Sequence, residues 1–552
     1  MIRGNILNVF TEEVYPAEIQ VENGLINCVK KIKGDFQGVI VPGLIDAHIH
    51  IESSMLTPSF FAKAVVPHGT TAVVADPHEI SNVMGIDGIN YMLKDAEKVP
   101  MHIFFSAPSC VPATPFETSG ATIDSEKIDL LMEKEEIVAL GEKMSYPGVI
   151  NNDSQEMTKI SSAKSHKKPV VGHAPLLTGV ELCKYVGAGI SNDHECVSLE
   201  EALEKNQMGM KIMVREGSSA KNLKDLINAG GEFLVSDDKH PEDLLKGHMD
   251  YIIKKAIKWG MNPIKAIKMA TINPAEHYSL NMGAISPGRN ADFIIVDNLE
   301  TFNVNKVFIN GKMVAEGDNA LFTADSIYIG NSIVLDKLLS SDFSINVLGN
   351  RALVRVMDVL DGQLITSESE AVLQINGGQI NANVKEDVLK ISVVERYGKG
   401  EHLKKENGKM SRGNISHGFV RGFGFKEGAF ASSVAHDSHN IIVVGTNNDY
   451  MARAVNILIK NQGGLVAVSR DEEISLKLPV AGLMAAENAQ KLSLKLKEIH
   501  SLARKMGCAL ESPFMAMSFL SLLVIPQLKI SDQGLFDVSK FQFVDIIKKI
   551  MD

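Results

Sequence analysis

A short apolar strand that ends in two histidines constrains this chain more than any other feature. The stretch GVIVPGLIDAHIHIE occupies residues 38–52. Residues i and i+2 of a strand project to the same face, so His48 and His50 would present two imidazoles side by side where the strand ends. An isolated His-x-His pair is usually solvated, but this pair closes a buried type of strand beside Asp46. We therefore interpret it as a pair of metal ligands.

Seven further strand-like runs follow, and helix-like stretches separate them. The eight runs are 39–51, 70–77, 102–109, 137–144, 169–175, 190–197, 211–216 and 232–238. Their spacing of roughly 20 to 35 residues is that of repeated strand-helix units. The body of each run is continuously apolar, as expected for parallel strands buried on both faces. The pattern predicts an α/β fold, a (β/α)8 TIM-like barrel over residues 39–280.

Polar side chains gather at the C-terminal end of these runs, which is the rim where barrel enzymes place their chemistry. They are Asp46, His48, His50, Asp76, His78, Glu142, His173, His194, Arg215, Glu216, Asp237 and Asp238. Chance would scatter such residues along the strands, so the rim is the predicted active site.

The segments that flank the barrel predict two further domains. Residues 1–38 and 281–335 contain short strands and turns that need each other as partners, and we expect them to form one small β-sandwich. Residues 336–552 begin with short strands and continue with helices, which predicts a C-terminal α+β domain. Within it, residues 450–460 carry a helical apolar stripe between Asn447–Asn448 as caps and Gly463–Gly464 as the stop.

Composition excludes several classes of partner. The net charge of −11 disfavours nucleic acid. The five cysteines are scattered without a C-x-x-C pair, so we expect neither a disulfide framework nor a thiolate zinc site, and we expect a reducing cytoplasm. No apolar run has the length of a membrane span or the form of an export signal.

Six of the rim residues form a ligand set for a binuclear site, in which one anion bridges two cations. They are His48, His50, Glu142, His173, His194 and Asp237. Each has a plain structural alternative: His173 as a core histidine, Glu142 as a surface ion pair, or Asp237 as a helix cap. Together, at successive strand ends, they favour metal. Nitrogen and oxygen ligands without sulfur suit Mn(II), Fe(II) or Zn(II).

The sequence also resembles a known family. VPGLIDAHIHIE resembles the first barrel strand of the amidohydrolase superfamily, and Glu142 stands where many members carry a carboxylated lysine. The stretches ADPHEI (75–80), MVREGS (213–218), SDDKHP (236–241), GFGFKEGA (422–429) and VAHDSHN (434–440) are similar to the bacterial adenine deaminases. The resemblance spans nearly the whole chain.

The resemblance implies hydrolytic deamination of adenine to hypoxanthine and ammonia, usually with two Mn(II) ions. An activated water would add to C6 of the purine while Asp237 takes its proton; Glu142 and His194 complete the catalytic set. The candidates for binding the base or orienting the ligands are Asp76, His78, Glu79, Arg215, Glu216, Asp238, His436, Asp437 and His439. Two alternatives stay open: an ion pair between Arg215 and Glu216, and a mere turn at residues 436–439.

Other functions remain in competition. The nearest rival is another amidohydrolase reaction, such as opening a cyclic amide, which would use the same barrel and metals. A non-catalytic barrel scaffold is a second rival, although all six ligands are retained. A cysteine-ligated base deaminase is excluded because the chain has no C-x-x-C pair. The expected partners are a small-molecule substrate, water and a second copy of the chain in a homo-oligomer, with a dimer favoured.

Overall fold

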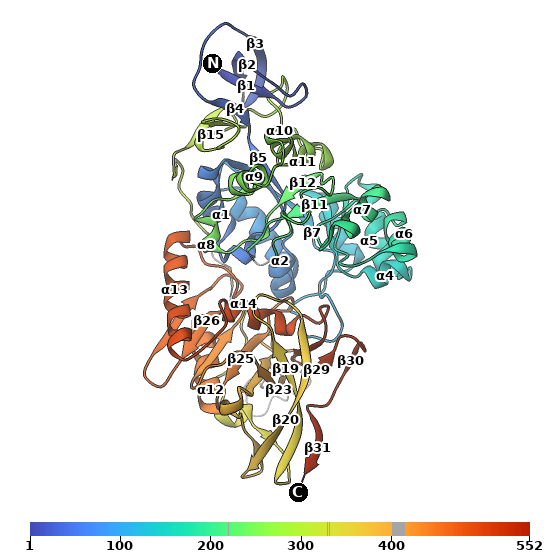
Figure 1. Ribbon diagram of the computed structural model, residues 1–552, viewed down its shortest axis with the longest axis vertical. Coiled ribbons are helices and arrows are strands. Elements are labelled where there is room, and N and C mark those ends of the chain that lie inside the picture. Colours follow the sequence, from blue (N-terminus) through green and yellow to red (C-terminus); the bar gives the residue numbers. More distant parts are fainter. Residues whose placement is uncertain (219, 328, 331, 400–413, 552) are drawn as a thin grey trace.

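The computed structural model describes residues 1–218, 220–327, 329–330, 332–399 and 414–551. A small sheet at the N-terminal end, a parallel strand-helix barrel and a sheet-rich C-terminal part follow one another along the long axis (Figure 1). Residues 400–413 and 552 of the predicted C-terminal domain lie outside the described residues. Within the described part of the chain, no helix combines the length and apolar character needed to cross a membrane.

The N-terminal sheet contains strands from both sides of the barrel sequence, in the order β17-β16-β15-β14-β4-β1-β2-β3. Their bounds are β1 Ile2–Asn8, β2 Glu13–Glu22, β3 Leu25–Lys31, β4 Val39–Pro42, β14 Phe293–Val296, β15 Val304–Ile309, β16 Lys312–Glu316 and β17 Asn319–Ala320. Asn310 and Gly311 join β15 to β16 with positive φ at both residues, as a two-residue hairpin turn requires.

The strand predicted over residues 39–51 is divided in two. Val39–Pro42 is β4 and pairs with β1 and β14 in the N-terminal sheet, whereas the barrel strand β5 begins at Leu44. Gly43 lies at the division, where a Cβ atom would lie 2.2 Å from Thr71 Oγ1. The expectation of one strand was wrong because a continuous apolar run does not show which sheet each part joins.

The barrel strands run parallel, and each predicted run contains one. They are β5 Leu44–His50, β6 Thr70–Ala75, β7 His102–Ala107, β8 Ile137–Lys143, β9 Val170–Gly172, β10 Asn192–Asp193, β11 Lys211–Arg215 and β12 Phe233–Val235, with the short β13 Asp237–Asp238 after β12. β5 to β9 and β13 form one sheet and β10 to β12 another. The two meet at both edges, because β13 follows β12 directly and pairs with β5, and because a bridge joins Val170 of β9 to Ile190 just before β10. The TIM-like α/β fold class is thereby confirmed.

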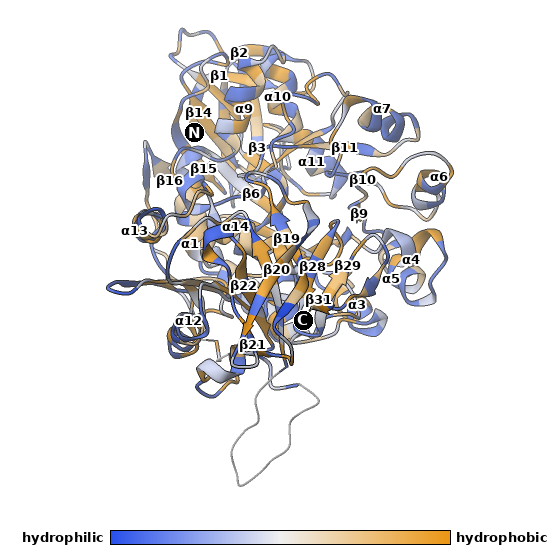
Figure 2. Ribbon diagram, turned by 60° about the horizontal axis from the view of Figure 1, so that its bottom comes forward, coloured by the Kyte–Doolittle hydropathy of each residue, from blue (hydrophilic) through white to orange (hydrophobic). Residues whose placement is uncertain are grey.

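Helices cover the outside of this barrel (Figure 1). They are α1 Pro58–Val65, α2 His78–Ala96, α3 Ser125–Met132, α4 Tyr146–Ile150, α5 Ser154–Ser165, α6 Gly179–Gly187, α7 Leu199–Gln207, α8 Pro241–Leu244, α9 Met249–Lys258, α10 Pro263–Met269 and α11 Ile272–His277. Hydrophilic residues colour most of the outer helix α7, whereas apolar residues follow the strands (Figure 2). This distribution is that of a core enclosed between a sheet and its helices.

The C-terminal part is built on one large sheet, ordered β18-β21-β20-β19-β23-β22-β25-β24-β26-β27, with β31 beside β19. Its strands are β18 Ile345–Asn346, β19 Arg351–Val359, β20 Thr366–Asn376, β21 Gln379–Ile380, β22 Leu389–Val394, β23 Ile415–Arg421, β24 Ala429–Ser432, β25 Ile441–Gly445, β26 Gly464–Val468, β27 Glu473–Lys477 and β31 Ile547–Met551. A smaller sheet holds β28 Leu528–Ser531, β29 Gly534–Asp537 and β30 Gln542–Phe543.

The predicted helix after Asn447 is confirmed as α12, Asn448–Asn461. The Asn447 side chain accepts a hydrogen bond from Tyr450 N, and Gln462 ends the helix with φ of 58° just before Gly463. Two further helices, α13 Ala489–Lys505 and α14 Pro513–Ser518, complete this part.

The C-terminal part covers the rim of the barrel. The loop between β7 and α3 reaches across to it: Thr118 N donates to Asp532 Oδ1 at 2.9 Å, and Ser531 Oγ donates to Phe116 O at 2.7 Å. The ring of Phe116 packs against that of Phe536. The predicted active site therefore lies at the junction of barrel and C-terminal sheet.

Candidate active site

The two histidines of β5 point into the rim and are almost fully buried, at 2% and 4% exposed for His48 and His50. His50 Nδ1 lies 3.0 Å from the carbonyl oxygen of Asp76, so Nδ1 carries the proton and Nε2 offers its lone pair to the site. His48 Nε2 is buried without a hydrogen-bond partner among the described residues. Both rings thus present a free ligand atom.

The Glu142 carboxylate at the end of β8 lies between the histidines. Its Oε1 is 3.0 Å from His50 Nε2, while its Oε2 is 2.5 Å from His173 Nδ1 and 3.3 Å from His194 Nε2. One carboxylate oxygen therefore faces the β5 histidines and the other faces the histidines that follow β9 and β10. This is the placement that a bridging ligand needs.

Asp237 completes the set from β13. Its Oδ1 is 3.4 Å from His48 Nε2 and 3.2 Å from His50 Nε2. Ligand atoms that share one cation at bonds of roughly 2.1 Å lie about 3.0 to 3.4 Å apart in tetrahedral or octahedral sites. The structure brings all six predicted ligands together, and their all-N/O donor set fits a divalent cation. The spacings around His48, His50, His194 and Asp237 fit as well, whereas His173 and Glu142 are at hydrogen-bond distance.

Asp76 and His78 orient these ligands from β6 and α2. Asp76 Oδ2 accepts a hydrogen bond from Glu142 N at 2.8 Å, and His78 Nδ1 lies 3.3 Å from Glu142 Oε1. At Gly141 a Cβ atom would lie 2.3 Å from Asp76 Oδ2, so glycine permits this contact. Asp238, the neighbour of Asp237, instead accepts a hydrogen bond from Ser53 Oγ at 2.5 Å.

Of the two alternatives for Arg215 and Glu216, the structure argues against an ion pair between them, because it gives each residue another partner. Arg215 Nη1 lies 2.8 Å from Asp237 Oδ2, and its guanidinium also pairs with both carboxylate oxygens of Glu195. Glu216 pairs with Lys255 at 2.6 Å. Although burial alone would raise the pKa of Asp237, the Arg215 charge holds it well below the ordinary range.

Glu195 is a site residue that the sequence reasoning missed. Its Oε1 lies 3.4 Å from His194 Nε2 and 3.8 Å from His173 Nδ1, and the Arg215 charge overcomes the effect of burial to lower its pKa. The signal was its position directly after His194, at the C-terminal end of its run. Only His194 was predicted as a ligand from this run, although Glu195 is the next residue.

The C-terminal part contributes His436, Asp437 and His439 to the rim. His436 Nδ1 lies 2.7 Å from Glu79 Oε1, and His439 Nε2 bonds the other oxygen of Glu79. Ala435 N donates to His439 Nδ1, so Nε2 of that ring carries the proton. Both contacts with Glu79 are therefore hydrogen bonds, and they are shorter than the distance between two ligand atoms that share a metal ion. His439 also has a φ of 53°, so the segment shapes a turn as well.

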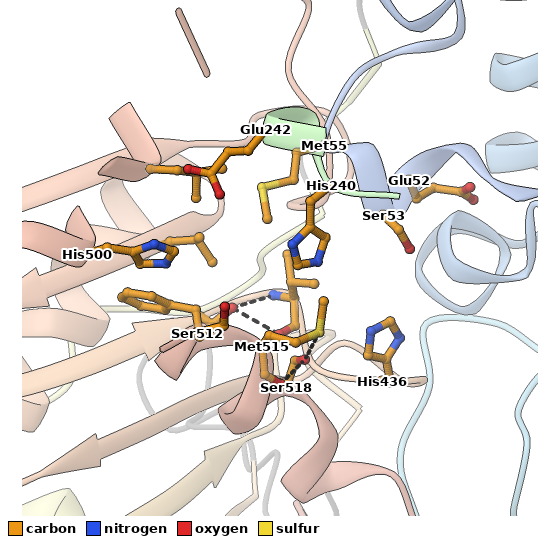
Figure 3. A pocket seen from close by; sticks show the side chains of 15 residues that line it. Glu52, Ser53, Met55, His240, Glu242, His436, His500, Ser512, Met515 and Ser518 are labelled. Carbon is orange, nitrogen blue, oxygen red and sulfur yellow. Dashed lines mark hydrogen bonds between the residues drawn. The ribbon is translucent and has the colours of Figure 1, made fainter. Parts of the chain in front are cut away.

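A cavity of about 50 Å³ lies beside the site, between barrel and C-terminal part (Figure 3). His240 and Met55 approach it from the barrel, and His500, Met515 and Ser518 from the other side. Ser53 and His436 also line it, and these bond Asp238 and Glu79 respectively. The cavity therefore borders the residues that surround the six ligands.

Comparison with known proteins agrees with a metal-binding barrel covered by a C-terminal domain. The Amidohydrolase family matches residues 39–314, and the Adenine deaminase C-terminal domain matches residues 363–542. A protein named adenine deaminase from Methanothermobacter thermautotrophicus is 54% identical over 557 residues, covering 100% of both chains. The chain belongs to the adenine deaminase family.

Relatives in this family come from archaea as well as bacteria, so the expected bacterial character holds only in part. The adenine deaminase of Methanosphaera stadtmanae is 51% identical over 553 residues, covering 100% of this chain and 99% of its own. That of Borreliella afzelii is 42% identical over 557 residues and covers 99% of each chain. Membership of the amidohydrolase family also implies a divalent metal, for which His48, His50, Glu142, His173, His194 and Asp237 are the candidate ligands.

Proposed function

We propose that this chain catalyses the hydrolytic deamination of adenine to hypoxanthine and ammonia with bound divalent cations. The observation that carries the proposal is the set of six converging ligands beneath a C-terminal part that matches the adenine deaminase C-terminal domain. Full-length relatives at 54% and 51% identity that bear the name adenine deaminase support the substrate.

The ligand set supports two cations, with Mn(II) the first candidate and Fe(II) or Zn(II) the alternatives. His48, His50 and Asp237 would hold one cation, His173 and His194 the other, and Glu142 both. When bound, such cations lower the pKa of water and so supply a hydroxide nucleophile near neutral pH.

The side chains of the site then transfer protons and orient the reacting groups. Water adds to C6 of adenine, the bond from C6 to the exocyclic nitrogen breaks, and ammonia leaves. Asp237 accepts one proton of the attacking water and passes it to the ring nitrogen N1 or to the departing amine, and the second proton of the water goes to the other of these two groups. Arg215, held by Glu195, fixes Asp237 Oδ2 at 2.8 Å and keeps this carboxylate ionised and oriented.

The remaining predicted substrate-binding residues contact protein groups that orient the site. Asp76 and His78 support Glu142, Asp238 binds Ser53, and Glu216 binds Lys255. We therefore assign these residues positioning roles. Glu79, His436 and His439 attach the C-terminal part to the rim.

We infer a cytoplasmic location, because the five cysteines are free thiols. We also infer a homodimer, which a mass measurement in solution tests directly.

The deciding experiment follows ultraviolet absorbance and ammonia with adenine, adenosine, cytosine, a hydantoin and dihydroorotate in parallel, using manganese-loaded protein. We expect rapid turnover of adenine and far slower turnover of adenosine. Ring opening of a cyclic amide without any turnover of adenine would reject deamination in favour of another amidohydrolase reaction. No turnover of any substrate by fully metallated protein would favour a non-catalytic scaffold.

A further inference from the structure

Residues 435–440 of the C-terminal part are held against the barrel by contacts at both ends. His436 and His439 bond the two oxygens of Glu79, at the start of α2. Asn440 Nδ2 donates to Thr118 O at 2.8 Å, in the loop after β7. Two separate barrel loops thus fix where this segment lies.

Asp437 and Ser438 lie between these anchors. Each residue is 3% exposed. Ser438 acts on Glu117 as a hydrogen-bonding neighbour, whereas Asp437 Oδ2 has no hydrogen-bond partner in the part of the chain that the structure describes. Buried polar atoms are nearly always hydrogen-bonded in native proteins, and a buried carboxylate oxygen without a partner is costly. Asp437 Oδ2 therefore points to a ligand that donates a hydrogen bond to it.

Contacts place this segment beside the metal ligands: Glu79 Oε1 lies 2.7 Å from His436 Nδ1 and 3.4 Å from His78 Nε2, and His78 Nδ1 lies 3.3 Å from Glu142 Oε1. Asp437 follows His436 directly. His78, Glu79, His436 and Glu142 all act on it electrostatically. On another side lies Glu117, whose pKa burial and the Asp437 charge raise to about 8. Burial also raises the pKa of Asp437, but only to about 6, so near neutral pH Asp437 is the ionised member of the two and Glu117 is mostly protonated. An ionised carboxylate accepts hydrogen bonds and cannot donate them.

Adenine offers hydrogen-bond donors only at its exocyclic amine and at the single ring N–H of its imidazole half. The amine must be near the attacking water, so the ring N–H is the donor left for a carboxylate elsewhere on the pocket wall. A nucleoside has no such N–H, because its sugar occupies that nitrogen.

We propose that Asp437 accepts a hydrogen bond from the imidazole N–H of the purine base and so selects free bases over nucleosides. The inference rests on the proposed deamination of adenine and assigns its specificity to a residue outside the barrel. A site built to bond one N–H rejects analogues that lack it, because its own buried group is then left unpaired.

The test measures direct binding to the metal-loaded full-length enzyme by calorimetry, with two unreactive ligands. One is purine; the other is the fused oxazolopyrimidine of the same shape, in which oxygen replaces the ring N–H and the second nitrogen of the five-membered ring is kept. We expect the wild type to bind purine roughly 10- to 100-fold more tightly than the oxazolopyrimidine. Asp437→Ala should bring the ratio close to one, mainly by weakening purine.

Asp292→Asn is the matched control, because Asp292 is a buried carboxylate that accepts from Asn310 N at 2.7 Å in the N-terminal sheet and, like Asp437, has one carboxylate oxygen without a hydrogen-bond partner among the described residues. It should leave the ratio as in the wild type. If Asp437→Ala does not fold, Asp437→Asn, which keeps the shape, should still lower the ratio.

An unchanged ratio in a folded Asp437 variant would overturn the inference and leave residues 436–439 as a turn. Because neither ligand is turned over, this result does not depend on deaminase activity. Failure of the wild type to deaminate adenine would reject the proposed function separately.

Discussion

Replacing Arg215 with methionine should destabilise the metal-free protein far more than the metal-loaded protein. The guanidinium is 8% exposed and pairs with two carboxylates, Glu195 and Asp237. Arg215→Met keeps an apolar side chain of similar length but leaves the buried Asp237 and the partly buried Glu195 beside Glu142 without their cation. Removing one partner of a buried pair costs about 3–5 kcal/mol.

Bound cations would replace part of the lost positive charge at Asp237. The extra negative charge strengthens cation binding, and any ligand that binds only the folded state stabilises it. We therefore expect the loss in unfolding free energy to be smaller by roughly 1 kcal/mol or more after metal loading.

Urea unfolding of chelator-treated and of manganese-loaded protein measures the loss of unfolding free energy without and with metal. The control is Arg453→Met, because Arg453 pairs with Glu473 at 2.9 Å but is 41% exposed. A surface pair of this kind is worth about 0–1 kcal/mol, with no dependence on metal. Equal losses for Arg215→Met with and without metal, or a loss no larger than that of the control, would refute the reasoning.

Three further outcomes follow from the site. Glu142→Ala should lose one or both cations by elemental analysis, and a variant that keeps two cations and full activity contradicts its bridging position. Asp237→Asn should lower kcat by roughly hundredfold or more while Asp238→Asn has a smaller effect, and the reverse order would exchange their roles. Burial lowers the pKa of His436, but Glu79 raises it overall from 6.5 to about 9. The pairing of His436 with Glu79 therefore stabilises the fold fully below pH 6.5, and this stabilisation is lost as the pH rises through 9. We expect the loss of unfolding free energy caused by Glu79→Gln, measured by urea unfolding, to become smaller between pH 6.5 and pH 9.

The barrel and its ligands could be predicted because their signals are local in sequence. A parallel strand buried on both faces needs a continuous apolar run, and the barrel topology places every strand end at one rim. His48, His50 and Asp237 could therefore be placed near one another without coordinates. Reliance on local signals also explains why residues 39–51 were predicted as one strand. That residues 39–42 join another sheet depends on their pairing with β1 and β14, which an apolar run does not show.

Contacts between side chains from different strands were beyond prediction. Arg215 lies 20 residues from Glu195 in sequence, and only the curvature of the barrel brings the guanidinium onto that carboxylate rather than onto the adjacent Glu216. The contact of His439 with Glu79 joins residues 360 apart. No hydrophobic period encodes such pairs, because they follow from how elements pack once they have formed.

The position of Glu142 shows how this chain supplies an anion between two groups of histidines without chemical modification. A lysine at that position becomes anionic only after it is carboxylated, whereas a glutamate is an anion as synthesised, with a shorter side chain. The shorter side chain must be held closely, and the structure does so: Asp76 receives the backbone N–H of Glu142, and Gly141 leaves room for that contact. His50 and His173 then reach opposite oxygens of the carboxylate at 3.0 and 2.5 Å. A Gly141→Ala variant should therefore weaken metal retention although residue 141 bears no ligand atom. Retention equal to the wild type would show that Asp76 can move without disturbing Glu142.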